Sequence, residues 1–107
     1  MGKGITIRYL QQYIRDKDHH PEASREYFLK LAEEVGELAR AMGKNPPPAT
    51  EETVKGSVEE EIWDVIYYAL ALANCYDIDI ERWILVKEAL SREKYGGPAF
   101  TSPNNDE

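Results

Sequence analysis

Four carboxylates stand in two pairs with the same three-residue spacing, Glu34 with Glu37 and Glu61 with Asp64. Side chains three residues apart on a helix occupy neighbouring positions on its surface, so each pair would present its two acids together. The second pair opens a segment, 62–75, that is almost wholly apolar apart from Asp64. Burying a carboxylate is costly unless something compensates its charge. Because the neighbouring groups are also acids, the pattern indicates a bound divalent cation, Mg²⁺ or alternatively Mn²⁺.

A single pair of acids at this spacing is common on the solvated face of a helix. A purely solvated role is what we expect of the other acids nearby, Glu33, Glu51, Glu52, Glu59 and Glu60. Two pairs on adjacent helices, one of them within an apolar run, favour the metal site instead. The loop between the helices is long enough to let them run antiparallel and face each other.

Apolar periodicity and helix end signals predict an all-α protein with no strands. The loop at 44–53 contains Pro46-Pro47-Pro48, which cannot continue a helix, and Ser57-Val58-Glu59-Glu60 has the pattern of a capping box. Asp79 is expected to cap the last helix. The four expected helices run from Thr6 to Asp16, from Pro21 or Glu22 to about Met42, from Ser57 to about Tyr76, and from Asp79 to about Tyr95.

These helices predict one domain over 1–96, followed by a disordered polar tail over 97–107. On the second helix the apolar residues are Phe28, Leu31, Val35, Leu38 and Met42, and the acids are expected on the flank of that stripe. The third helix is apolar almost all round, with Ile62, Ile66, Ala69 and Ala73 on one side. Four short helices bury such a helix poorly, so we expect a bundle completed by oligomerisation, as a homodimer or homotetramer.

The bulk composition excludes several classes of function. A net charge of −7 argues against nucleic-acid binding, which needs clustered Lys and Arg. No apolar run reaches the length needed to span a membrane. The single cysteine, Cys75, excludes an internal disulfide framework and is typical of a reducing compartment. These observations predict a cytoplasmic protein.

The acidic motifs resemble those of the MazG-like nucleotide pyrophosphohydrolases. The segment KLAEEVGELA, from Lys30 to Ala39, resembles the first motif of that family, Glu-x-x-Glu. The second motif, Glu-x-x-Asp, is matched by Glu61-Ile62-Trp63-Asp64 after a gap of 23 residues, and DVIYYALALANCY continues it. The resemblance covers about Phe28 to Tyr95.

This resemblance implies an all-α, MazG-like fold and a Mg²⁺-dependent hydrolase. Such an enzyme cleaves a nucleoside triphosphate between the α and β phosphates and releases a nucleoside monophosphate and pyrophosphate. The substrate would be a non-standard or excess NTP or dNTP. Metal would be held by Glu34, Glu37, Glu61 and Asp64, and either Glu34 or Glu37 would take the proton of the attacking water.

The resemblance also implies contacts from the fourth helix to the phosphates of the substrate. Lys87 and Lys94 are the expected contacts, although cations near a helix C-terminus also stabilise it through the helix dipole. Ser91 stands where several relatives have Asn. Asn74 either contacts the substrate or ends its helix. Tyr68, which shares a stripe with Asp64, is the first of the aromatic residues expected to contact a base, although packing is the commoner role of Tyr68, Trp63, Tyr67 and Trp83.

Two other hypotheses remain open at this stage. The fold and chemistry could serve phosphoribosyl-ATP as substrate, as a phosphoribosyl-ATP pyrophosphohydrolase. Alternatively, the chain could be a non-catalytic helical dimer that binds a nucleotide or a protein partner without turnover. Product formation separates the last hypothesis from the other two.

Overall fold

The computed structural model describes residues 4–100, and the helices within this range account for all its regular structure. In order along the chain they are α1 (Ile7–Lys17), a 3₁₀ turn (Pro21–Ala23), α2 (Ser24–Gly43), α3 (Val58–Cys75) and α4 (Ile80–Tyr95). The predicted all-α fold with four helices is therefore confirmed. The predicted tail falls partly outside the described residues.

The ends of the helices follow the local chemistry of the sequence. Thr6 caps α1 by accepting a hydrogen bond from the backbone N–H of Tyr9 at 3.0 Å. Ser57 caps α3 by accepting from the N–H of Glu60 at 3.1 Å. The return half of the expected capping box is shifted by one residue, because the Glu60 carboxylate accepts from the N–H of Gly56 at 2.7 Å. Both hydroxyls satisfy backbone donors that a helix start leaves free.

Asp79 is the N-cap residue of α4, as predicted, and α4 begins directly after it. The Asp79 side chain makes no capping hydrogen bond. Its carboxylate instead accepts from the guanidinium of Arg8, with 2.8 Å between Arg8 Nη2 and Asp79 Oδ2. Arg8 lies 71 residues away from Asp79 in the sequence, so local patterns do not reveal that it competes with the helix N-terminus for this carboxylate.

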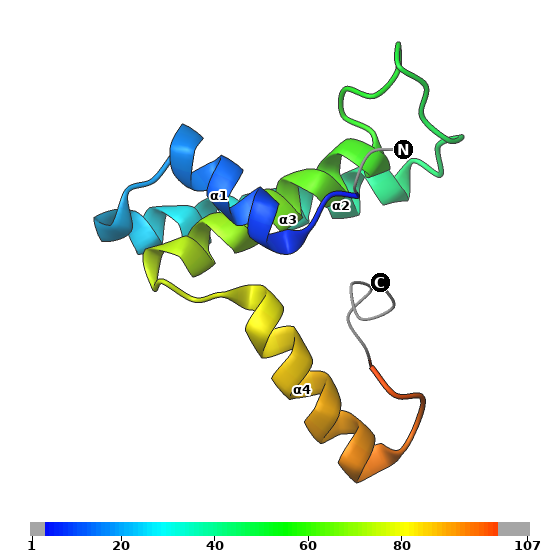
Figure 1. The fold of residues 1–107 in the computed structure, drawn as a ribbon. Coiled ribbons are helices and arrows are strands. Elements are labelled where there is room, and N and C mark those ends of the chain that lie inside the picture. Colours follow the sequence, from blue (N-terminus) through cyan, green and yellow to red (C-terminus); the bar gives the residue numbers. More distant parts are fainter. Residues whose placement is uncertain (1–3, 101–107) are drawn as a thin grey trace.

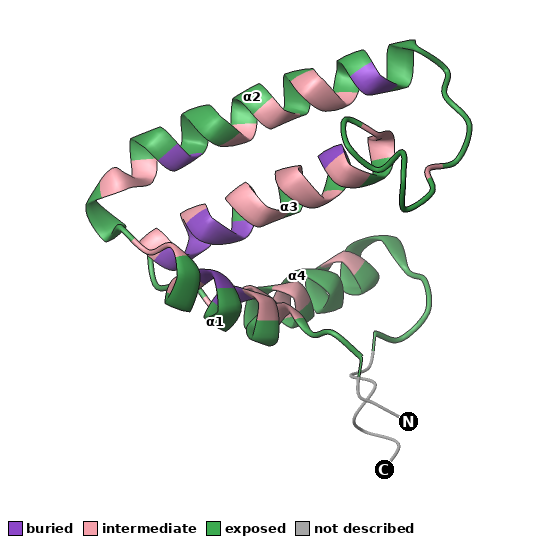
Figure 2. Cartoon of the chain, turned by 90° about the horizontal axis from the view of Figure 1, so that it is seen from above, coloured by how far each residue is buried: buried purple, intermediate pink, exposed green. Residues whose placement is uncertain are grey.

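Figure 1 shows α2 and α3 running side by side as a hairpin, and Figure 2 shows α1 packed on the side of α3 away from α2. The core consists of Ile14, Tyr27, Leu70 and Ala71, with Leu10, Leu72 and Ile80 among the residues packed against it. No residue of α4 is buried, and this helix projects away from the hairpin (Figures 1 and 2). The hairpin and α1 therefore form the packed body of the single chain.

The face that α2 turns toward α3 agrees only in part with the predicted one. Leu31 and Leu38 lie on it as predicted, together with Tyr27, Glu34 and Ala41, and all five are buried or half-buried. Phe28, Val35 and Met42, predicted on the same stripe, are exposed by 55%, 50% and 61%. Glu34 is therefore on the packed face of α2 rather than on its flank.

α3 turns its acidic stripe toward α2, the side on which the two acid pairs were expected to meet. Glu61 is buried, and Asp64 and Tyr68 are half-buried. Ile62 and Ile66, on the side expected to be covered by a partner chain, are 46% and 39% exposed in the single chain. The hairpin thus places its acids inside and several large apolar side chains outside. No helix within residues 4–100 is long and apolar enough to cross a membrane.

Candidate metal centre

Three of the four predicted acids converge between α2 and α3. Glu34, Glu61 and Asp64 each offer a carboxylate oxygen, and the three oxygens lie within 4.8 Å of one another. Glu34 comes from the packed face of α2, while Glu61 and Asp64 come from the first two turns of α3. The seam of the hairpin therefore brings acids 27 and 30 residues apart in sequence to one point.

Glu61 is the most confined of the three acids. Glu61 is only 8% exposed to solvent. Its Oε1 atom is buried and has no hydrogen-bond partner among the described residues. A buried acceptor without a partner is costly and rare in folded proteins. A cation at this point would supply the missing partner. The unpartnered oxygen of Glu61 is therefore the observation that shows that these three acids fit a metal ion.

Electrostatics supports the same interpretation. Burial, followed by the adjacent Glu34 carboxylate and the charges of Asp64 and Glu60, raises the pKa of Glu61 to about 7. Burial, together with the charge of Glu60, also raises the pKa of Asp64. Both shifts show that negative charge is disfavoured here in the absence of a cation. Oxygen-only donors of this kind suit the hard cations Mg²⁺ and Mn²⁺.

Glu37 lies outside the converging group. Its carboxylate is 3.4 Å from the guanidinium of Arg40, one turn further along α2, and its side chain is 45% exposed. Exposed pairs at this spacing hold their geometry weakly, so the side chain of Glu37 is free to change partner. A fourth ligand role for Glu37 stays a prediction, because the structure places the residue beside the cluster but not in it.

The predicted substrate contacts divide into two groups. Tyr68 lies on α3, one turn after Asp64, and lines an adjacent cavity with it. Asn74 is 1% exposed, and its carboxamide is occupied by Gln11 at 2.9 Å and by Arg15 at 3.1 Å. These bonds tie α1 to α3 and give Asn74 a structural role in the single chain. A contact between Asn74 and substrate has no geometric support there and stays a prediction.

Lys87 and Lys94 lie on α4, and Figure 2 shows α3 between this helix and α2. Lys94 stands over the ring of its neighbour Tyr95, with 5.2 Å from Nζ to the ring centroid. A role for either lysine at the acids of the same chain therefore stays a prediction. Arg92 donates to the carbonyl of Gly97 at 3.1 Å and so closes the C-terminal end of α4.

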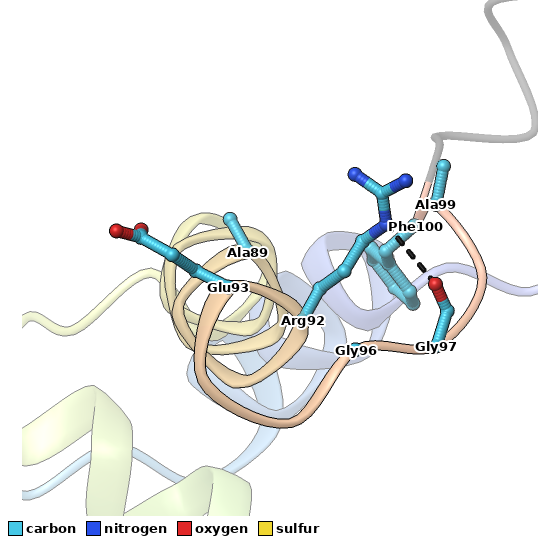
Figure 3. A pocket seen from close by; sticks show the side chains of 7 residues that line it. All are labelled: Ala89, Arg92, Glu93, Gly96, Gly97, Ala99 and Phe100. Carbon is cyan, nitrogen blue, oxygen red and sulfur yellow. Dashed lines mark hydrogen bonds between the residues drawn. The ribbon is translucent and has the colours of Figure 1, made fainter.

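A pocket at that end of α4, about 530 Å³ in volume, does not resemble a reactive site. Figure 3 shows Arg92 and Phe100 on one side, while the carboxylate of Glu93 points away from them. Its polar groups do not converge on one point.

Two residues of α1 that reach the neighbourhood of the site, Tyr13 and Lys17, were not among the predicted site residues. Both line the cavity that contains Asp64 and Tyr68. Neither residue belongs to a motif that marks it in the sequence. Only the crossing of α1 over α3 reveals their position.

Comparison with known proteins decides the family. Residues 22–94 match the MazG nucleotide pyrophosphohydrolase domain. The chain belongs to the MazG family. The crystal structure of iMazG from Vibrio DAT 722 superposes with a TM-score of 0.81 at 41% sequence identity, covering 87% of this chain and 100% of that one. The MazG-like fold predicted from the two acidic motifs is thus confirmed.

Curated MazG relatives include proteins with and without a stated activity. The chain is 46% identical over 58 residues to the uncharacterized protein YpjD of Bacillus subtilis (strain 168), which is 50% of each chain. It is 32% identical over 82 residues to dCTP pyrophosphatase 1 of Rattus norvegicus, covering 72% of this chain and 46% of the relative. The chain spans about half the length of the curated relatives it matches.

Proposed function

We propose that this chain is a Mg²⁺-dependent nucleoside triphosphate pyrophosphohydrolase. It would cleave a non-standard or excess NTP or dNTP between the α and β phosphates, giving a nucleoside monophosphate and pyrophosphate. Family membership and the named activity of the rat relative support this reaction class. The single observation that carries the proposal is the buried, unpartnered oxygen of Glu61 within the three-acid cluster.

In this proposal Glu34, Glu61 and Asp64 hold the metal, and Glu37 is the fourth acid available to it. Bound Mg²⁺ would neutralise phosphate oxygens and lower the pKa of a water molecule. Neutralisation is needed because the chain carries a net charge of −7 and a triphosphate is itself an anion. A cation held by the three acids at the seam would thus convert a repulsive surface into a site that accepts phosphate.

The reaction forms a bond between the oxygen of water and the α phosphorus and breaks the bond from that phosphorus to the bridging oxygen. The bridging oxygen leaves with pyrophosphate. The proton of the attacking water needs an acceptor within hydrogen-bond reach. Of the two candidates predicted from the sequence, Glu37 is the better placed, since Glu34 already belongs to the converging group. Glu37 is engaged only by the exposed pair with Arg40.

The exposed apolar side chains of the hairpin support the predicted oligomer. Phe28, Val35 and Met42 on α2 and Ile62 and Ile66 on α3 are between 39% and 61% exposed in the single chain. Contiguous apolar surface in a folded domain commonly marks an interface. We propose a homodimer or homotetramer in which copies of this chain cover these residues. The same assembly is the route by which Lys87 and Lys94 of one chain could approach the acids of another.

The proposed reaction is tested by incubating the full chain with a panel of canonical and damaged NTPs and dNTPs, with Mg²⁺ and with EDTA. Both products are then identified by chromatography. The proposal predicts equal amounts of monophosphate and pyrophosphate from at least one nucleotide, and none with EDTA. Release of inorganic phosphate with a diphosphate product would contradict α–β cleavage. Binding without any product would make the chain a nucleotide-binding module.

A further inference from the structure

Glu37 lies on α2 between the acid cluster and Arg40. Glu34, Glu37 and Arg40 follow one another at three-residue spacing, so their side chains form one row along the surface of the helix. Glu34 is the end of this row that belongs to the cluster, where its carboxylate meets those of Glu61 and Asp64. Arg40 is the other end. Glu37 therefore has a possible partner on each side.

In the structure the carboxylate of Glu37 is turned toward Arg40, with 3.4 Å between Glu37 Oε1 and Arg40 Nη2. Electrostatics accounts for this arrangement. The seam already contains three carboxylates, and without a cation a fourth would add to their mutual repulsion. The guanidinium of Arg40 offers the opposite charge one turn away in the other direction.

A divalent cation at the seam would change this balance. Its two positive charges attract Glu37 in competition with the single charge of Arg40. The side chains of Arg40 and Glu37 are 72% and 45% exposed, so water screens their attraction and the pair is weak. Glu37 can therefore leave Arg40 at a small cost in free energy. That cost reduces the affinity of the chain for the cation, because the pair must break before Glu37 can turn.

We propose that Arg40 is a positioning residue that holds Glu37 away from the metal centre until a divalent cation binds. Cation binding breaks the pair of Glu37 with Arg40 and turns the carboxylate toward the seam. Arg40 thereby weakens the binding of the cation. This inference rests on the metal centre of the proposed function, and it adds a residue that regulates how readily that centre is loaded.

The test is the affinity for Mg²⁺ alone, measured by calorimetry at about 0.1 M ionic strength, where charges more than about 10 Å apart are largely screened. The wild type is compared with Arg40→Gln, which keeps a long polar side chain and removes the charge. The control is Arg25→Gln, which removes an exposed charge at the opposite end of α2.

Arg40→Gln should bind Mg²⁺ about 2-fold more tightly than the wild type, the size expected for the loss of an exposed ion pair at this spacing. Arg25→Gln should bind Mg²⁺ as the wild type does. An affinity of Arg40→Gln that is equal to or below that of the wild type would overturn the proposal.

Loss of a positive charge near the seam could also strengthen binding directly, without any movement of Glu37. The same substitution is therefore made in the Glu37→Gln variant, which completes a double-mutant cycle. If Arg40 acts through Glu37, Arg40→Gln leaves the Mg²⁺ affinity of this variant unchanged. A gain that persists in the Glu37→Gln background would show direct repulsion between Arg40 and the cation, and it would overturn the proposal.

Nuclear magnetic resonance gives a readout of the pair itself. During a titration with Mg²⁺, the Nε–H signal of Arg40 should shift with occupancy in the wild type and stay in place in Glu37→Gln. A signal that does not move in the wild type while Mg²⁺ binds would show that the pair survives, contrary to the proposal.

The proposals fail in distinguishable ways. If the wild type does not bind Mg²⁺, the proposed metal centre fails and the inference falls with it. If the wild type binds Mg²⁺ and releases no pyrophosphate from any nucleotide, the proposed reaction fails, while the affinities still decide the role of Arg40. If pyrophosphate is released and the cycle shows no coupling between Arg40 and Glu37, only the role of Arg40 is wrong.

Discussion

Replacing Glu61 by Gln should stabilise the metal-free protein at neutral and alkaline pH. Gln has nearly the same shape as Glu, keeps an acceptor at the buried position and carries no charge. The wild-type carboxylate has a pKa of about 7 in the folded protein, against 4.5 as the ordinary value. The folded state therefore binds more protons than the unfolded state between these two pH values. As pH rises through this window, the free energy of unfolding of the wild type falls.

The size of the effect follows from the same shift. One unit of pKa corresponds to about 1.4 kcal/mol, so the full window corresponds to at most about 3.5 kcal/mol. The titration of Glu61 is coupled to the neighbouring carboxylates of Glu34 and Asp64. Replacing Glu61 alone therefore recovers only part of this free energy of unfolding. We expect a gain of about 1–3 kcal/mol at pH 8. For a domain near 100 residues, each kcal/mol corresponds to about 4–8 °C in Tm.

The assay is thermal and urea unfolding in EDTA at pH 5 and pH 8. Glu33→Gln is the matched control, because Glu33 is an exposed acid of α2 paired only with Lys30. The stability of Glu61→Gln relative to wild type should rise from pH 5 to pH 8, whereas that of the control should not. Added Mg²⁺ should then reverse the order, because binding to the folded wild type stabilises it and the variant has lost a ligand. An equal difference at both pH values would show that the Glu61 carboxylate does not titrate differently in the folded and unfolded states.

Three further substitutions test one of the proposed metal ligands, the hydrogen bonds that join α1 to α3, and the cap of α3. Asp64→Asn should lower kcat/KM by at least about 100-fold while leaving the fold intact, since one donor of the proposed metal is lost, as measured by pyrophosphate release and circular dichroism. Gln11→Ala should lower stability by about 2–4 kcal/mol in urea unfolding, because the side chain bonds to Asn74, to the carbonyl of Ile78 and to the N–H of Ile80. Ser57→Ala should cost about 1 kcal/mol in the same assay through loss of the α3 cap.

Much of this architecture could be predicted from local chemistry. The prolines at 46–48, the Ser57 cap and Gly96, which ends α4 with a φ of 78°, mark helix ends in the sequence itself. The acids at 34, 61 and 64 could be paired because their spacing and the loop between the helices suffice to bring them to one seam. These features depend on few residues that are close in sequence.

The orientation of the helices could not be predicted in the same way. On α2 the apolar residues Phe28, Val35 and Met42 suggested the inward face, but Tyr27, Glu34 and Ala41 face inward in their place. Where a helix is apolar on several sides, periodicity does not decide which side meets the neighbour. The ion pair of Arg8 with Asp79 and the position of Lys17 over Tyr67 likewise join distant segments that no local pattern connects.

We propose that the acids of the α2–α3 seam hold the metal on which α–β cleavage depends. The most direct test is to measure pyrophosphate release as a function of Mg²⁺ concentration for the wild type, Glu34→Gln and the control Glu33→Gln, using the nucleotide with the fastest wild-type turnover. We expect that Glu33→Gln follows the wild type, and that Glu34→Gln needs far more Mg²⁺ or loses turnover altogether. If Glu34→Gln released pyrophosphate with the wild-type dependence on Mg²⁺, the site would lie elsewhere.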